Sequence, residues 1–292
     1  MKLTERIKHR ILSFPGFGGL RLAEYVRQWV MPRNLPPPPD DSTVPDTLFG
    51  QAGIDLKAAG QLDLLRRLKQ HSAVFRSLRE QKEINVWGTP DRIANGMFHT
   101  PDAEIYAGLI MEFAPSQIVE IGSGFSTRIA RVALDAAGNS APLIAVDPQP
   151  RCDVQPMVSR LLQQPIEDVD LDNFDVAPGS ILFIDSSHIC RTGGDLPRIF
   201  CQILPSLPPG VLVHVHDIFI PYDYPVCYQR GLWNEQYLLH ALLSGGRRFE
   251  VVLAIHFLSR FHPDALRDAI SPDAGRDKHS FGASFWFRTT AG

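Results

Sequence analysis

The sequence predicts an α/β fold in which a doubly wound, mostly parallel sheet follows a helical N-terminal appendage. From residue 105 onward, short β-branched runs alternate with helical stretches, which is typical of parallel strands joined by crossover helices. A proline run at residues 36–39, followed by two aspartates, interrupts the chain before this pattern begins, because proline cannot continue a helix. We therefore expect an appendage with a proline-rich linker over residues 1–45, a helical lead-in over 46–97 and the main domain over 98–292.

Apolar spacing predicts the individual elements. Leucines at helical spacing indicate a helix within residues 54–78, and further helices are expected at 126–137, 197–204 and 234–243. Buried parallel strands are predicted at 118–121, 143–146, 181–184 and 211–215 because each apolar run is flanked by Gly, Pro or Asp. Two further strand-like runs cover 249–257 and 283–288. The segment between them, 259–280, holds two prolines and many charges and is predicted to be a mobile loop.

Composition indicates a folded protein that acts on a small molecule. The chain has 292 residues, 44% of them apolar, which supply a sizeable core. With 29 basic and 32 acidic residues the formal net charge is -3, so we expect no nucleic-acid partner. The apolar stretch near the N-terminus is about half the length that spans a bilayer, so no stable membrane insertion is expected. Four scattered cysteines without a C-x-x-C pair favour a cytoplasmic location. A homo-oligomer is left open.

A glycine turn follows the first predicted strand. The run Val119-Glu120-Ile121-Gly122-Ser123-Gly124-Phe125-Ser126-Thr127 places G-x-G between a buried strand and a helix. Glycine lets a ligand approach the backbone, and the free amides at the helix start suit an anionic group. Asp147 ends the next strand, where a carboxylate can accept both hydroxyl protons of a ribose. These features predict a site for an adenine nucleoside.

Two cofactor classes compete for this site. A dinucleotide fold needs a third glycine at the position of Thr127, and its absence counts against a nicotinamide cofactor. The turn instead resembles that of class I, Rossmann-like methyltransferases, in which an acidic strand residue precedes G-x-G. A nicotinamide-dependent oxidoreductase and a catalytically silent nucleoside-binding module remain the alternatives.

Three further segments strengthen the resemblance, which covers about residues 98–290. The runs FIDSSH (183–188), HVHDIF (214–219) and PYDYP (221–225) look like a bacterial class I methyltransferase family largely uncharacterised as to substrate. The final pair of strands resembles the reversed hairpin that closes the methyltransferase sheet. The resemblance implies S-adenosylmethionine as cofactor, held by the motif residues Glu120, Gly122, Ser123, Gly124, Thr127 and Asp147. It also places Asp168 near the adenine.

Ionisable residues follow the third and fourth predicted parallel strands, 181–184 and 211–215. Open α/β sheets bind their ligands at this end of the strands. We expect His188 to act as the general base that removes a hydroxyl proton from a small-molecule acceptor, assisted by Asp185. Asp185, His216 and Asp217 are alternatively the ligands of a divalent metal. Some sugar-modifying methyltransferases look similar, but His216 replaces one of their carboxylates, which argues against magnesium. If neither role applies, Asp185, His216 and Asp217 have only a structural role. His214 is expected in the core.

The predicted function is therefore methyl transfer from S-adenosylmethionine to a small metabolite, with oxygen favoured over nitrogen as the acceptor atom. Other side chains near these segments carry weaker predictions. Asp102 precedes the helix that leads into the first strand, and the rings of Tyr222, Tyr224 and Trp233 either line a substrate pocket or belong to the core.

Overall fold

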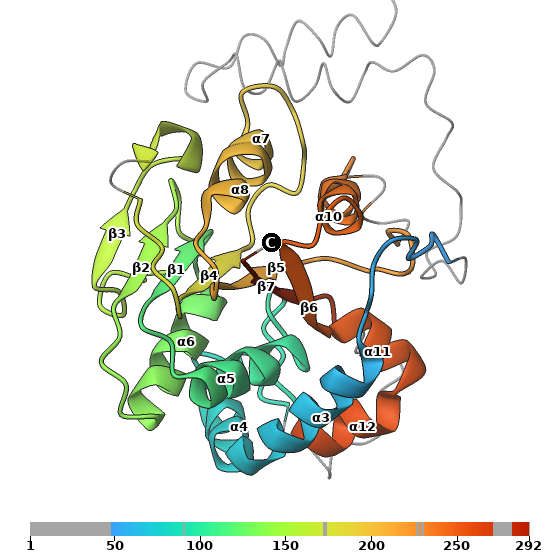
Figure 1. Cartoon of the computed structure of the whole chain (residues 1–292). Helices are drawn as coiled ribbons and strands as arrows, with labels where there is room; N and C mark the ends of the chain where they lie inside the picture. The colour runs from blue at the N-terminus through green and yellow to red at the C-terminus, as the bar shows by residue number, and fades with distance from the viewer. Residues whose placement is uncertain are drawn as a thin grey trace, which may run out of the picture. The chain divides into compact units, whose positions relative to one another are not determined.

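A seven-stranded sheet forms the centre of the computed structural model, which describes residues 48–89, 91–171, 174–225, 228, 231–270 and 282–291 (Figure 1). The expected appendage at 1–45 lies outside these residues. The strand order is β3-β2-β1-β4-β5-β7-β6. The strands are β1 (Ile118–Ile121), β2 (Leu143–Val146), β3 (Arg160–Leu162), β4 (Ile181–Ile184), β5 (Leu212–Val215), β6 (Phe249–Ala254) and β7 (Phe285–Thr289).

The pairing of β1 with its two neighbours fixes where a ligand can bind. β1 is parallel to both β2 and β4, with Ile121 in register with Val146 and Ile184. The chain first builds outward to β3 and then returns to β4 on the other side, so the strand order reverses between β1 and β4. In an open α/β sheet, ligands bind beyond the carboxyl ends of the strands at such a switch point.

The final strand is reversed, as the sequence predicts. β7 runs antiparallel to both β5 and β6, and it lies between them rather than at the edge of the sheet. The edge position belongs to β6, which therefore runs parallel to β5.

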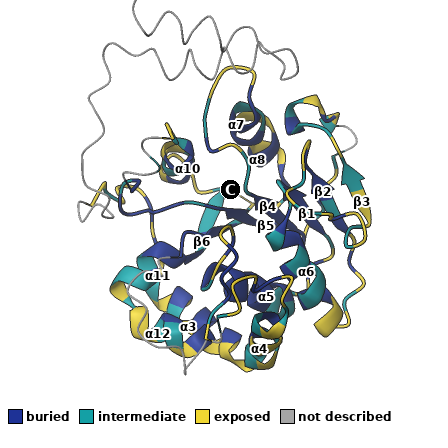
Figure 2. Ribbon diagram, turned by 180° about the vertical axis from the view of Figure 1, so that it is seen from behind, coloured by how far each residue is buried: buried dark blue, intermediate teal, exposed yellow. Residues whose placement is uncertain are grey.

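Helices cover both faces of the sheet, as a doubly wound fold requires (Figure 1). One face carries α3 (Ala58–Leu68), the turn η1 (Lys69–His71), α4 (Ser72–Glu80), α5 (Asp102–Phe113), α6 (Phe125–Ala136), α11 (Ile255–Phe261) and α12 (Pro263–Ile270). The other carries α7 (Asp195–Arg198), the π-helical η4 (Ile199–Ile203), α8 (Leu204–Ser206) and α10 (Glu235–Ser244). An apolar cluster fills each interface, and the strands are buried between them (Figure 2). Among the described residues, no helix has the length and apolar character needed to cross a membrane.

Two predictions of secondary structure were wrong, and one strand was missed. The strand expected over 249–257 ends at Ala254, where α11 begins. The loop expected over 259–280 contains α12, because Leu266, Ala269 and Ile270 are spaced to bury one helical face; residues 271–281 lie outside the described part. The edge strand β3 was not predicted, since three residues are too few to show an alternating pattern.

Candidate functional site

Gly122 opens the turn after β1 and lies against the end of β4. Its φ is 89°, and a Cβ added there would lie 1.9 Å from the carbonyl oxygen of Asp185. The backbone amide of Asp185 in turn donates to the carbonyl of Ile121 at 2.9 Å. Glycine is therefore required by close packing of two backbones. Glycine at position 122 was expected for ligand approach, and the packing against Asp185 gives a different reason for it.

Glu120 stabilises the glycine turn through Thr127. The Thr127 hydroxyl donates to Oε2 of Glu120 at 2.5 Å and accepts from the backbone amide of Gly124 at 3.0 Å. Tyr106 donates to the other carboxylate oxygen at 3.2 Å. Burial raises the pKa of Glu120 to about 7, although the hydrogen bonds from Thr127 and Tyr106 oppose that shift. Glu120 is fully buried, and through Thr127 it supports the turn.

Asp147 joins the end of β2 to the same turn. Its Oδ2 accepts from the backbone amide and the hydroxyl of Ser123, at 2.8 and 2.9 Å, and its Oδ1 accepts from the amide of Gln149 at 2.8 Å. A carboxylate offers about four acceptor sites and three are used here, so Oδ1 can accept one further hydroxyl proton. Asp168 is exposed in the short helix η2 (Ile166–Asp168), which follows β3.

Asp185, His216 and Asp217 meet at the carboxyl ends of β4 and β5. The Nδ1 atom of His216 lies 3.7 Å from Oδ1 of Asp185 and 3.5 Å from Oδ2 of Asp217. One ligand atom from each of the three lies within 4.8 Å of the others. This geometry could hold one divalent cation, and its mixed nitrogen and oxygen donors suit a borderline metal better than magnesium.

The protonation of His216 follows from the same carboxylates. Burial lowers the pKa of His216, but Asp217 and Asp185 raise it well above the ordinary value. A metal ligand must be a neutral imidazole, so a cation bound here would displace this proton.

His188 contacts carboxylates through both ring nitrogens. Its Nε2 lies 3.3 Å from Oδ1 of Asp185 and 3.6 Å from Oδ2 of Asp217, and its Nδ1 lies 2.9 Å from Oε2 of Glu235. Burial lowers the pKa of His188, but hydrogen bonds to Asp185 and Glu235 raise it to about 10. Both ring nitrogens of His188 thus face carboxylates that favour its protonated form.

Glu235 was not predicted as a site residue, and Asp102 carried only a weak prediction. Glu235 resembles an ordinary acidic residue in the first turn of a helix, here α10, and only its full burial sets it apart. Asp102 accepts from the backbone amides of Ala283 and Ser284 at 2.8 and 3.0 Å. These bonds hold one of its oxygens 3.6 Å from Nε2 of His216.

The aromatic and core residues divide clearly. Tyr222 and Tyr224 are buried, whereas the Trp233 ring stacks on His188 with centroids 4.1 Å apart. His214 is fully buried and forms a 2.9 Å hydrogen bond with the Ser284 hydroxyl. Burial lowers the pKa of His214, so it remains a neutral core residue as expected.

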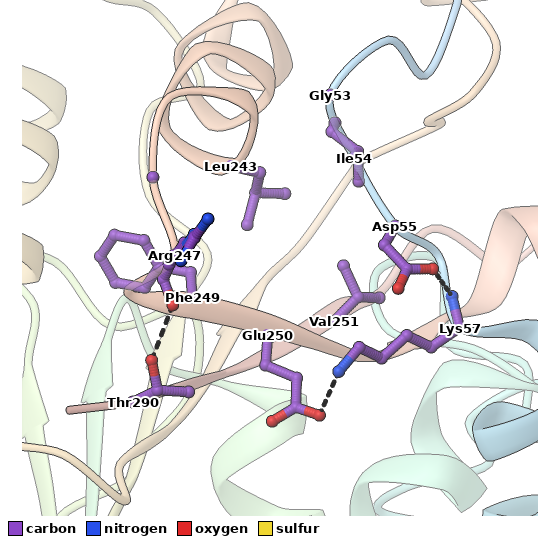
Figure 3. A pocket seen from close by; sticks show the side chains of 11 residues that line it. Gly53, Ile54, Asp55, Lys57, Leu243, Arg247, Phe249, Glu250, Val251 and Thr290 are labelled. Carbon is purple, nitrogen blue, oxygen red and sulfur yellow. Dashed lines mark hydrogen bonds and ion pairs between the residues drawn. The ribbon is translucent and has the colours of Figure 1, made fainter. Parts of the chain in front are cut away.

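A pocket elsewhere on the sheet contains none of these residues. It lies beside the amino end of the edge strand β6, where Lys57 forms an ion pair with Glu250 (Figure 3). β6 is parallel to β5, so the pocket lies at the amino ends of the parallel strands. The glycine turn lies at their carboxyl ends.

Comparisons with known proteins agree with the predicted family. Residues 119–218, which span β1 to the end of the cluster, match the family model of a methyltransferase domain. An uncharacterized protein of Archaeoglobus fulgidus is 34% identical over 150 residues, covering 48% of this chain and 67% of the relative.

Solved structures similar to the chain include the SAH-bound methyltransferase PaMTH1 of Podospora anserina, with a TM-score of 0.42 and 13% identity over 95% of this chain and 98% of the other. A putative methyltransferase of Thermobifida fusca has a TM-score of 0.39 and is 15% identical in sequence. The match covers 87% of this chain and 99% of the other.

Proposed function

Because the chain belongs to a class I methyltransferase family, we propose that it transfers a methyl group from S-adenosylmethionine to a hydroxyl of a small molecule. One observation carries this proposal. The glycine turn that follows β1 and the ionisable cluster that follows β4 touch each other, since Gly122 packs on the backbone of Asp185. A methyl donor bound over the turn would therefore lie beside the groups that prepare the acceptor.

The turn supports a nucleoside cofactor through two side chains with different tasks. Asp147 is bonded to the turn, and its Oδ1 retains one acceptor site for a ribose hydroxyl. Ser123 and Gly124 present the backbone of the turn, while Glu120 and Thr127 keep it in shape from the protein side. Asp168 follows the neighbouring strand β3 and is exposed, which is compatible with contact to the adenine.

The transfer requires a group that accepts the hydroxyl proton. The methyl–sulfur bond breaks as the oxygen–methyl bond forms, the hydroxyl proton passes to a base, and neutral S-adenosylhomocysteine leaves. His188 fills this role once Asp185 and Asp217 are engaged by a cation or by the acceptor, because their charges then no longer hold a proton on the ring. Without such a partner His188 is protonated and acts as a hydrogen-bond donor.

A divalent cation fits the proposal without being necessary to it. Asp185, His216 and Asp217 would hold the cation, which would lower the pKa of an acceptor hydroxyl bound to it. The acceptor itself would then complete the coordination shell and be oriented toward the donor.

Isothermal titration with S-adenosylmethionine, S-adenosylhomocysteine and NADH tests the cofactor class. We expect the first two to bind and NADH not to bind. The Asp147→Ala variant should weaken S-adenosylhomocysteine by about 1.5–3 kcal/mol, the scale of a charge-assisted hydrogen bond. Ser123→Ala, which removes only one bond to Asp147, is the matched control and should lose less. Binding of NADH alone would instead favour an oxidoreductase, and nucleoside binding without transfer to any acceptor would favour a silent module.

A further inference from the structure

Three consecutive residues at the start of α10 hold the segment that contains His188. Trp233 stacks on the His188 ring, Asn234 bonds to the backbone of the segment, and Glu235 bonds to the ring itself. We call residues 233–235 the histidine clamp. Nothing in the sequence links them to His188, from which they are separated by more than forty residues.

The backbone part of the clamp stabilises an unfavourable conformation. His188 has a φ of 60°, in the left-handed region that a residue with a side chain seldom adopts. Its carbonyl accepts from the amide of Asn234 at 3.0 Å, and the Asn234 side-chain oxygen accepts from the amide of Cys190 at 2.6 Å. The two bonds hold the turn on both sides of this residue.

The side-chain part of the clamp selects which nitrogen faces the site. Glu235 lies 2.9 Å from Nδ1, so this nitrogen carries a proton and donates it to the carboxylate. The other nitrogen, Nε2, is thereby left facing Asp185 and Asp217 at the carboxyl ends of the strands. The Trp233 ring covers one face of the imidazole and restricts its rotation.

The burial of Glu235 is energetically unfavourable for a residue that would only stabilise the fold. Its carboxylate is fully buried on α10, and its second oxygen, Oε1, has no hydrogen-bond partner among the described residues. Burying a carboxylate costs several kcal/mol unless it is well paired, and apolar residues of similar volume often stabilise a fold as well or better. Among the residues that the structure describes, the hydrogen-bond partner of the Glu235 carboxylate is the His188 ring nitrogen that faces away from the cluster.

We propose that Glu235 is a positioning residue for methyl transfer, which acts through His188 by fixing the ring orientation and its proton on Nδ1. This inference rests on the proposed function only in its kinetic consequence, because the contact itself can be tested without an acceptor. The arrangement matches the general rule that a histidine's reactive nitrogen is set by the hydrogen bond that its other nitrogen makes.

Proton NMR of the ¹⁵N-histidine-labelled protein tests the contact. The Nδ1 proton of His188, assigned with a His188→Gln variant, should give a strongly downfield and slowly exchanging signal in the parent. Glu235→Gln should move this signal upfield or remove it, because the charge of the acceptor is lost. Tyr237→Phe changes another side chain of α10, whose hydroxyl donates to Asp223 and not to His188, and should leave the signal in place. An unchanged His188 signal in Glu235→Gln would overturn the proposal.

Kinetics test the role of the contact with an acceptor that is turned over. Glu235→Gln should lower kcat on the order of 10²-fold, the scale of a positioned general base, with unchanged affinity for S-adenosylhomocysteine. Tyr237→Phe should keep the parent's kcat. Full kcat in Glu235→Gln, with a large loss in His188→Gln, would overturn the positioning role and leave the base intact. Full kcat in both variants, with the NMR contact confirmed, would instead reject His188 as the base in the proposed function.

Discussion

The hydroxyl of Thr127 accepts from the amide of Gly124 and donates to the carboxylate of Glu120, linking the glycine turn to the core of the protein. The acidic residue that precedes G-x-G therefore acts on the turn through a second side chain. A glycine at position 127, as in dinucleotide-binding turns, could not make this link. Thr127 therefore counts against a nicotinamide cofactor, and its hydroxyl makes the link to Glu120 that a glycine at this position could not make.

Thr127→Val should disrupt this link at nearly constant side-chain volume. The amide of Gly124 and Oε2 of Glu120 each lose a buried partner, so we expect a loss of about 1–3 kcal/mol in the free energy of unfolding. Affinity for S-adenosylhomocysteine should fall as well, because the turn is less well held. Thr127→Ser keeps the hydroxyl and is the control. Chemical denaturation and titration calorimetry give the two quantities, and equal behaviour of Val and Ser would remove Thr127 from the account.

Glu120 should make the stability of the parent protein fall with rising pH. Its pKa is raised from 4.5 to about 7 by burial, so between these values the folded state holds a proton that the unfolded chain has released. The free energy of unfolding therefore decreases by roughly 3 kcal/mol across this window, and the stabilisation is greatest at its acidic end.

Glu120→Gln keeps an oxygen for Thr127 but cannot ionise. Subtracting the pH profile of this variant from that of the parent isolates the Glu120 contribution from those of all other groups. The difference should change by roughly 3 kcal/mol between pH 4 and 8 in urea denaturation. Parallel profiles would show that Glu120 ionises in the folded protein as it does in the unfolded chain.

Gly122 should tolerate no side chain, even one as small as that of alanine. The added Cβ would meet a backbone oxygen at 1.9 Å, and φ is positive, so Gly122→Ala should destabilise the protein by about 3 kcal/mol or more. Gly60 of α3 has open space around its Cβ position and is the matched control. Gly60→Ala should be neutral or stabilise by up to about 1 kcal/mol. Thermal melts of both variants check this, and a stable Gly122→Ala would contradict the observed packing.

Much of the sheet could be predicted from the sequence because β1, β2, β4 and β5 are short, largely apolar runs flanked by Gly, Pro or Asp. Ile118–Ile121 and Ile181–Ile184 appear where they were expected, and the cluster that follows β4 and β5 forms because neighbouring parallel strands end at the same edge. This local pattern fails at α12. Its apolar residues become informative only when α3 is known to lie beside them.

The chemistry of the site was harder to predict than its position. The contacts of His188 with Asp185 and Asp217 follow from the strand ends, but its contact with Glu235 of α10 depends on the fold. Glu235 could not be recognised for the same reason. A residue's type and its place in a helix are visible in the sequence, whereas its burial and its long-range partners are not.

The cluster of Asp185, His216 and Asp217 should bind a divalent cation and release a proton on doing so. The two carboxylates hold a proton on His216, and a cation must displace it, so affinity should increase with pH. We expect Zn²⁺ or Mn²⁺ to bind more tightly than Mg²⁺, because one donor is a nitrogen. In equilibrium dialysis, Asp217→Asn should weaken cation binding at least tenfold. Loss of a residue that only bonds to a metal ligand already lowers affinity by about that factor, and Asp217 is expected to be a ligand itself. Asp135→Asn, a change in an exposed carboxylate of α6, should leave binding unchanged. If no cation binds at millimolar concentration, the cluster is held by its own protons, and the acceptor alone must engage Asp185 and Asp217.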